Sequence, residues 1–529
     1  MAKSKRKKAQ QSDDSSDIDL SGLAKRLKKV PIQTWVLLLL LLIPIFLAAY
    51  FRAYPATLPV TDQWADNSIR TNARNILDQQ VRVNFPNLPA QNRAEVVDEE
   101  WAKLTEKNQA LIYDPQQRQV VQVPYDQALA GYSASFKQAM QNDKGETYLL
   151  AIDPWVYYMV ARNIATNGHA GDTLKDGEPW NSYAGAPYGG SADNNLHSHI
   201  QYYTYKVLKI FKPGMSVMGG AFWVPLIIAA LSVIPAFFIV RRKAGIFGGF
   251  IAATIIAVHS AYLGRTPAGF SDTDAYNVFF PLLVAWLFLE ALETKDLKKK
   301  LILAGGAGLA LGAYSNIWVG WWYIFDIILA AIVGYIGFVI LKQVIAWYRK
   351  KEKLSPKKVW DSVKGTVMLT AVFVVVTGAI VSYFYNLQFF LELPLQAIQF
   401  SQLKVAANPN LWPNVLTTVA ELNEVNFGGV VGQMGGKFLY ALALIGVASA
   451  LLPFKRRIKG KDLLFIGLAL LITVYLVSAG ALQRSAISYL ILLGLPLLVG
   501  LIMLLFDKRD IDVKYALLIL IWFIVSMYA

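Results

Sequence analysis

Apolar blocks of membrane-spanning length constrain this chain more than any other feature of its sequence. A helix needs about 20 mainly apolar residues to cross the roughly 30 Å hydrocarbon core of a bilayer. Blocks that suffice, allowing for tilt or distortion, occur at 34–51, 217–240, 245–263, 276–293, 301–317, 320–346, 366–386, 437–453, 463–479, 484–505 and 514–529. Hydrophobic residues form 55% of the 529 residues and charged residues only 16%, which excludes a soluble protein of this length. We therefore expect an all-α integral membrane protein with about 11–13 spans.

The distribution of basic residues predicts which way the spans run. Lys and Arg are enriched in the cytoplasmic loops of membrane proteins. If the N-terminus is cytoplasmic, the basic loops all fall inside, at 241–243, 295–300, 348–358, 455–462 and 507–514. The loops that fall outside are poor in Lys and Arg, namely 264–275, 387–436 and 480–483. We therefore expect a multi-pass protein of the cell membrane with a cytoplasmic N-terminus, and this layout explains the net charge of +15 without a nucleic-acid partner.

The chain divides into four parts by composition. Residues 1–33 are polar and basic, and we expect a disordered cytoplasmic tail. Residues 34–51 form the first transmembrane anchor; a cleaved signal peptide is the alternative, but the charged stretch before this block is long for one. Residues 52–213 form a large polar external loop, in which apolar residues at helical spacing over about 60–147 indicate a small helical insert. Residues 214–529 form the multi-span transmembrane domain, whose long external loop is 387–436.

Acidic residues in the expected external segments are the first candidate site residues. With no cysteine and four histidines in the chain, a thiolate site is excluded and a zinc site has little to draw on. Asp153 precedes a proline in AIDPWVYY, a pattern typical of a helix start. Asp272 and Asp274 alternate in RTPAGFSDTDAYN; such carboxylates suit a hard divalent cation, and equally a helix N-terminus. Glu421 lies in the long external loop, which is either a mobile functional segment or a solvated connector.

Two arginines and two histidines are candidates for contact with an anionic substrate. Arg265 precedes Asp272 by seven residues, where it can neutralise the acids or meet an anion. Arg484 falls at the external edge of a late span, where an ionisable residue is a functional candidate and a guanidinium pairs well with phosphate. The alternative for Arg484 is a side chain that simply extends to the membrane interface. His197 and His199 lie in NNLHSHIQYY, in the first external segment.

Together these motifs resemble one family, the catalytic subunit of archaeal-type oligosaccharyltransferase, a glycosyltransferase of the GT-C fold. DPWVYY resembles the family's first-loop aspartate motif, and RTPAGFSDTDAYN resembles its second acidic motif with the arginine that precedes it. QRSAISYLILLGLP resembles the late span whose arginine contacts the lipid pyrophosphate. TVAE resembles the mobile-loop motif, which here consists of Thr418, Val419, Ala420 and Glu421. The resemblance covers the membrane part, from about residue 34 to the end of the chain.

The resemblance implies a fold and an activity. The fold would be a GT-C-type multi-span helical bundle with a large first external loop. The enzyme would transfer an oligosaccharide from a polyprenyl (dolichol) phosphate or pyrophosphate carrier to the side-chain amide of asparagine in an N-X-S/T sequon, at the external membrane face. Its partners would be the polyprenyl-linked oligosaccharide donor, an acceptor polypeptide that carries the sequon, and membrane lipid.

The resemblance also implies roles for the candidate residues. Asp153 and Glu421 match the catalytic acids that hold the acceptor carboxamide. Asp153, Asp272 and Glu421 match the acids that bind a metal ion, Mn²⁺ or Mg²⁺, and Asp274 lies beside them in the sequence. Arg484 matches the ligand of the carrier phosphate. Additional candidates for binding that lipid phosphate are Arg265, His197 and His199.

One departure from the family and two alternatives remain. The family carries a soluble C-terminal domain with a WWDYG motif that reads the sequon, and no such segment follows the last apolar block here. That domain is therefore expected on a separate chain or as a missing part. A first alternative is another GT-C transferase that uses polyprenyl-phosphate sugars, such as a protein O-mannosyltransferase. A second is a multi-span transporter or flippase, although transporter sites lie near the bilayer midplane whereas these acids lie in external loops.

Overall fold

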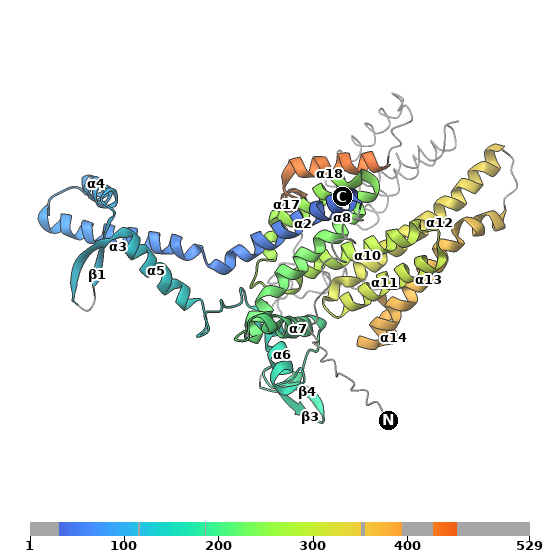
Figure 1. Ribbon diagram of the computed structural model, residues 1–529, viewed down its shortest axis with the longest axis horizontal. Helices are drawn as coiled ribbons and strands as arrows, with labels where there is room; N and C mark the ends of the chain where they lie inside the picture. Colours follow the sequence, from blue (N-terminus) through green and yellow to red (C-terminus); the bar gives the residue numbers. More distant parts are fainter. Residues whose placement is uncertain (1–30, 115–116, 186, 351–354, 394–426, 452–529) are drawn as a thin grey trace, which may run out of the picture.

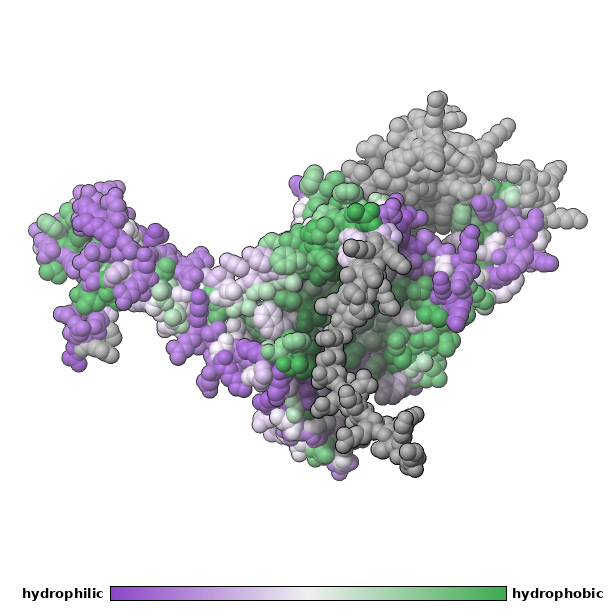
Figure 2. All heavy atoms as spheres, in the orientation of Figure 1, coloured by the Kyte–Doolittle hydropathy of each residue, from purple (hydrophilic) through white to green (hydrophobic). Residues whose placement is uncertain are grey.

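The computed structural model describes residues 31–114, 117–185, 187–350, 355–393 and 427–451. Helices dominate these residues, and Figure 1 shows a bundle of long helices with a smaller arm that projects from it. Figure 2 shows mainly hydrophilic residues on the arm, whereas hydrophobic residues cover much of the visible bundle. Five stretches of the described chain are helical, long and apolar enough to cross a bilayer. The expected fold class, a helical multi-span membrane protein, is confirmed.

The five stretches contain helices α2 (Ile32–Ala53), α8 (Val217–Val258), α10 (Tyr276–Glu293), α12 (Trp322–Lys350) and α13 (Pro356–Phe384). α8 is the exception to a simple match with the apolar blocks, because its 42 residues cover two of the expected spans. A straight helix of that length would measure about 63 Å, roughly twice the hydrocarbon thickness. Gly245, with φ 71° and ψ −172°, interrupts the helical geometry between the two blocks. Only glycine adopts this conformation readily, so its position divides α8 where the sequence pattern expects a break.

Large aromatic side chains and close helix contacts form the core of the bundle. The ring of Phe280 on α10 stacks on Tyr314 of α11 (Leu297–Ser315), with centroids 5.2 Å apart. Phe288 meets Phe373 of α13 edge-on at the same distance of 5.2 Å. A Cβ on Gly312 of α11 would lie 2.5 Å from the Cβ of Ile380 on α13. Small residues allow such close approach between helices in membranes, where packing rather than water exclusion drives association.

The arm is a compact unit with its own apolar core. It consists of α3 (Val60–Asn84), α4 (Ala90–Glu106), β1 (Gln109–Asp114), β2 (Gln119–Pro124) and α5 (Tyr125–Ala139). β1 and β2 form an antiparallel hairpin that pairs Gln109 with Pro124. Ile69 and Leu77 of α3 pack with Trp101 of α4 in a core that is almost fully buried. The sequence predicts a helical insert in this region, and the helices are accompanied by a hairpin that the helical pattern does not reveal.

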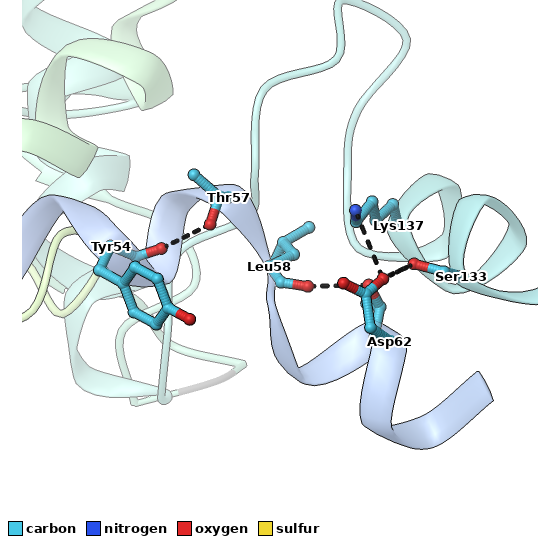
Figure 3. A network of polar contacts seen from close by, with 7 residues as sticks. Tyr54, Thr57, Leu58, Asp62, Ser133 and Lys137 are labelled. Atoms are coloured by element: carbon cyan, nitrogen blue, oxygen red, sulfur yellow. Dashed lines mark hydrogen bonds and ion pairs between the residues drawn. The ribbon is translucent and has the colours of Figure 1, made fainter. Parts of the chain in front are cut away.

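An elbow between α2 and α3 sets the direction of the arm (Figure 3). The chain passes through the short η1 (Tyr54–Thr57) and then through Leu58, whose φ of 53° is left-handed. Asp62 of α3 accepts a hydrogen bond from the Ser133 hydroxyl of α5 and lies 3.8 Å from Lys137 Nζ. The first and last helices of the arm are therefore fastened to each other next to the elbow.

A layer of short elements covers one end of the bundle. It contains α6 (Asp153–Asn167), β3 (Thr173–Lys175), β4 (Glu178–Asn181), β5 (Gly190–Ser191), α7 (Leu196–Phe211), α9 (Ser260–Arg265) and η2 (Thr273–Ala275). The strands form one antiparallel sheet in the order β3-β4-β5. Figure 1 shows α6, α7, β3 and β4 together at this end, far from the adjoining ends of α12 and α13. The remaining elements are η3 (Val319–Trp321), α14 (Leu387–Leu391), α17 (Phe427–Gln433) and α18 (Gly436–Leu451).

Candidate functional site

Residues 266–275, named here the acidic loop, connect α9 to α10 and contain the second acidic motif. Backbone hydrogen bonds join this loop to two distant stretches of chain. Leu150, three residues before α6, donates from its amide to the carbonyl of Gly269 at 2.9 Å. The Gly269 amide donates in turn to the carbonyl of Phe222 in α8 at 2.8 Å. These bonds bring the start of α6, and with it the first acidic motif, against the acidic loop.

Arg52, at the end of the first span, holds the beginning of the acidic loop. Its side chain is fully buried, and its Nε donates to the Thr266 hydroxyl at 2.8 Å. Its Nη1 donates to the carbonyl of Ala257 at 2.8 Å, and its guanidinium lies over the Tyr262 ring at 4.7 Å. Its own backbone carbonyl accepts from the amide of Ala268 at 2.9 Å. The sequence gives no sign of this role, because Arg52 reads as an ordinary basic residue that follows an apolar block.

Asp153 is the first residue of α6, and a proline follows it as expected for a helix start. Its side chain is exposed, and among the described residues it has no hydrogen-bond or ion-pair partner. Ala151, two residues earlier, has a left-handed φ of 64°. Such a conformation costs a non-glycine residue about 1–3 kcal/mol and persists only where the surroundings impose it. The turn into α6 therefore presents the Asp153 carboxylate with its oxygens available.

The two aspartates of the second motif have different surroundings. Asp272 is the N-cap of η2, and its Oδ1 accepts from the Thr273 amide at 2.6 Å. Asp274 Oδ2 lies 3.3 Å from Arg265 Nε, and the Arg265 guanidinium also lies over the Phe270 ring at 5.2 Å. Of the two roles expected for Arg265, the structure therefore shows the one in which it neutralises an acid. The same ion pair occupies an oxygen of Asp274, which is also a candidate metal ligand because it lies beside Asp272 in the sequence.

Tyr157, one turn into α6, marks the point where carboxylates converge. Burial and then the negative charges of Asp272, Asp193 and Asp153 raise the pKa of Tyr157 to about 12. The three acids come from three separate stretches of chain, and each lies close enough for its charge to act on one phenol. Asp193 is absent from the sequence-based candidates. It lies in the polar loop before α7, where the Asn195 side chain donates to it at 3.0 Å, and no local pattern sets it apart from other loop acids.

The convergence of these acids stops short of a complete metal site within the described residues. No group of three histidine, aspartate or glutamate side chains there is close enough to hold a metal ion. Glu421, the third acid expected from the sequence, lies outside the described residues, as do Thr418, Val419, Ala420 and Arg484. Their roles stay predictions.

His197 is a buried connection between α7, α10 and the acidic loop. Its side chain is fully buried; Nε2 lies 2.9 Å from the Ser271 carbonyl oxygen and Nδ1 lies 3.0 Å from the Tyr276 hydroxyl. Burial lowers the pKa of His197 to about 4. Both nitrogens are used and the ring is neutral, so the expected contact with a lipid phosphate does not fit this position.

His199, the second expected histidine, is half-buried and points elsewhere on α7. Its Nε2 lies 2.6 Å from Asn194 Oδ1, and burial lowers its pKa. Nothing in the described part of the chain links His199 to the acidic loop. Its proposed contact with the carrier phosphate stays a prediction.

Comparison with known proteins identifies the family. A family model described as the N-terminal part of the oligosaccharyl transferase STT3 matches residues 127–529. The chain belongs to the STT3 family. A dolichyl-phosphooligosaccharide-protein glycotransferase of Methanococcus voltae is 30% identical over 404 residues, covering 72% of this chain and 44% of that protein. A protein of the same name from Methanocaldococcus jannaschii is 27% identical over 469 residues, covering 71% and 48%.

The chain also aligns with a solved structure of an archaeal protein. A crystal structure of the Archaeoglobus fulgidus oligosaccharyltransferase in complex with Zn and sulfate aligns at 16% identity with a TM-score of 0.36, over 71% of this chain and 45% of that chain. The chain spans about half the length of the curated relatives it matches.

Membership in the STT3 family confirms the resemblance inferred from the motifs. The matched segment contains Asp153, Asp193, Asp272 and His197, together with every expected site residue that lies outside the described part. It begins at residue 127, so residues 60–126, which form most of the arm, precede it. The site of this STT3-family chain therefore lies in the part shared with the family, whereas most of the arm lies before that part.

Proposed function

We propose that this STT3-family chain carries the catalytic site of an oligosaccharyltransferase. It transfers an oligosaccharide from a polyprenyl (dolichol) phosphate or pyrophosphate carrier to the side-chain amide of asparagine in an N-X-S/T sequon. The observation that carries the proposal is that Asp153, Asp193 and Asp272, from three stretches of chain, all lie near enough to Tyr157 for their charges to raise its pKa, inside the segment that matches the family. The names of the archaeal relatives, dolichyl-phosphooligosaccharide-protein glycotransferases, support the donor and the acceptor.

The acceptor amide defines the chemical problem. Its nitrogen is a poor nucleophile because its lone pair is delocalised into the carbonyl. Asp153 presents an exposed carboxylate that can accept a hydrogen bond from one N–H of the amide, and we assign the second N–H to Glu421. Two such bonds weaken the conjugation and favour attack by nitrogen. The C–N bond to the sugar then forms as the C–O bond to the carrier phosphate breaks, and the amide proton leaves to a carboxylate.

The leaving phosphate defines the second requirement, which is positive charge. Asp272 uses Oδ1 for the Thr273 amide, so Oδ2 remains for a hard cation, and Asp153 supplies further oxygen donors. This donor set fits Mn²⁺ or Mg²⁺ once Glu421 completes it. When bound, the ion would stabilise the negative charge that develops on the phosphate. We assign the same task to Arg484, because a guanidinium forms paired hydrogen bonds with phosphate oxygens.

We assign the orientation in the membrane from the charges at the two ends of the bundle. α6, against which the acidic loop lies, is at one end, and the adjoining ends of α12 and α13, which flank the basic segment around 348–358, are at the other (Figure 1). Because basic loops remain in the cytoplasm, we assign the acidic end to the external face and the N-terminus to the cytoplasm. The carrier lipid then presents its phosphate at the membrane surface beside the acids.

Transfer of glycan to a fluorescent Asn-X-Thr peptide tests the proposal. Membranes that contain the full-length chain would receive the peptide, Mn²⁺ and a dolichyl-pyrophosphate-linked chitobiose donor. Asp153→Asn should reduce transfer by at least about 100-fold, because it removes a charge that acts only at the reaction centre. Glu99→Gln is the matched control, since Glu99 is 71% exposed on the arm and should retain the parental rate. Parental transfer by Asp153→Asn would show that the proposed site is wrong.

A further inference from the structure

His197 lies where the two acidic motifs meet. It touches the acidic loop through Ser271, α10 through the Tyr276 hydroxyl, and α6 through the ring of Tyr157, whose centroid lies 4.8 Å away. The His197 and Tyr157 rings meet edge-on at 75°, as aromatic pairs prefer. His197 thus contacts both the carbonyl that precedes Asp272 and Tyr157, the residue on whose phenol the charges of the acids act.

The hydrogen bonds of His197 define a single tautomer. The Ser271 carbonyl can only accept, so Nε2 must carry the proton and donate to it. Nδ1 then accepts from the Tyr276 hydroxyl, and a neutral ring is satisfied at both nitrogens. Gln201, one turn further along α7, packs against the same place: its amide nitrogen lies 3.1 Å from His197 Nε2, donates to Ser271 Oγ at 3.0 Å, and lies 3.4 Å from the Ser271 carbonyl oxygen.

Ser271 immediately precedes Asp272, so its carbonyl fixes the backbone from which that carboxylate extends. On the other side, Tyr276 begins α10, and its ring lies 5.3 Å from the His197 ring, centroid to centroid. His197 therefore contacts the chain on both sides of the Asp272–Asp274 pair, at Ser271 and at Tyr276. The ring is fully buried, so its hydrogen bonds are shielded from water. Hydrogen bonds in such an interior are stronger than hydrogen bonds at a surface.

We propose that His197 is a positioning residue, whose neutral ring fixes the Asp272 carboxylate relative to Asp153 by tying the acidic loop to α7 and α6. Its consequence for glycan transfer rests on the proposed function, whereas its consequence for the order of the acidic loop does not. Residues that orient metal ligands in this way commonly change metal affinity by about 10- to 100-fold when replaced. The role differs from that of a phosphate ligand, which would need an accessible nitrogen.

Hydrogen exchange of the purified full-length chain tests the tie directly. His197→Phe keeps a ring of similar size but removes both hydrogen bonds, and it should speed exchange of the amides in 266–275 by roughly 10-fold relative to the arm. His199→Phe, the same change two residues further along α7, should leave this exchange unchanged. A loss of general stability would instead speed exchange in the arm and bundle together. Unchanged exchange in 266–275 for folded His197→Phe would overturn the proposal.

His197→Gln provides a second variant if the phenylalanine variant does not fold. The glutamine amide can still donate to the Ser271 carbonyl, so the protection of 266–275 should be largely restored. Exchange as fast as in a variant that lacks the donor would contradict the proposed tie.

Binding of Mn²⁺, measured from the loss of the free-ion paramagnetic resonance signal, extends the test. His197→Phe should raise the half-saturating Mn²⁺ concentration by about 10-fold or more and leave the pH dependence of binding unchanged. If the parental protein binds Mn²⁺ with this dependence on His197 but transfers no glycan, the proposed function fails and the positioning role stands. Parental Mn²⁺ affinity in folded His197→Phe would refute the positioning role and leave the function intact.

Discussion

Gly269→Ala is a sharp test of how the acidic loop is held in place. Gly269 has φ 95°, in the left-handed region, where an L-residue costs about 1–2 kcal/mol. A Cβ there would lie 2.6 Å from Cε2 of the Phe222 ring and 3.2 Å from Cγ of Leu150. Phe222 is only 5% exposed, and overpacking against a buried ring of this kind costs about 1–3 kcal/mol. Together the two effects should lower the local stability of the loop by about 2–5 kcal/mol.

Hydrogen exchange followed by mass spectrometry measures this free energy. A loss of about 2–5 kcal/mol corresponds to exchange of the loop amides that is about 30-fold to several thousand-fold faster. The peptides to follow cover 266–275 and 148–152, because the Leu150 amide donates to the Gly269 carbonyl. Gly264→Ala is the matched control, since a Cβ on Gly264 of α9 meets no heavy atom within 4 Å. If Gly269→Ala exchanged within about threefold of the parental protein, the reasoning from backbone geometry and ring contact would be refuted.

Three further predictions address the metal requirement, the arm and the bundle. Chelation with EDTA should abolish glycan transfer and added Mn²⁺ should restore it; transfer that persists after chelation would contradict the proposed cation. Burial raises the pKa of Glu146, but hydrogen bonds from the Ser216 hydroxyl and amide outweigh it, so the pKa is lowered. This contact should therefore stabilise the protein at neutral pH, and the stabilisation should be lost as pH falls below about 4.5. Proteolysis of 140–152 should show this pH step in the parental protein and not in Glu146→Gln. Gly312→Val should separate α11 from α13, because a Cβ alone meets Ile380 at 2.5 Å, and should lower the thermal stability of the purified protein, while Gly334→Ala, with open space around it, should not.

The spans were predictable because each apolar block must find a non-aqueous environment regardless of its neighbours. A break between the two apolar blocks of α8 was also expected, at the basic residues 241–243, and the structure has it as a kink at Gly245. The hairpin of the arm was not foreseen. Its strands are short. Burial is irregular in QALIYD and alternates in QVVQVP only between exposed and half-buried residues, so the helical spacing of the surrounding segments dominates the pattern.

The candidate site was predictable only where the chain carries a motif. Asp153 and Asp272 stand out by their neighbours in sequence, and their meeting at one site was expected from the family resemblance; the place of Tyr157 beside them was not foreseen. Asp193 and Arg52 carry no motif, because their roles depend on chain segments that meet only in three dimensions. His197 was recognised as a candidate, but its buried contacts with Ser271 and Tyr276 were not foreseen. Burial and the Ser271 carbonyl decide its role, and neither can be read from NNLHSHIQYY.

Arg52 connects the first span directly to the acidic loop, although the two are far apart in the sequence. Both its guanidinium and its backbone carbonyl bind the acidic loop, so α2 cannot lean without drawing Thr266 and Ala268 with it. Spans lean to match the thickness of the surrounding lipid. A change in the tilt of α2 is therefore expected to act on the acidic loop first at Thr266 and Ala268, the two residues that Arg52 holds.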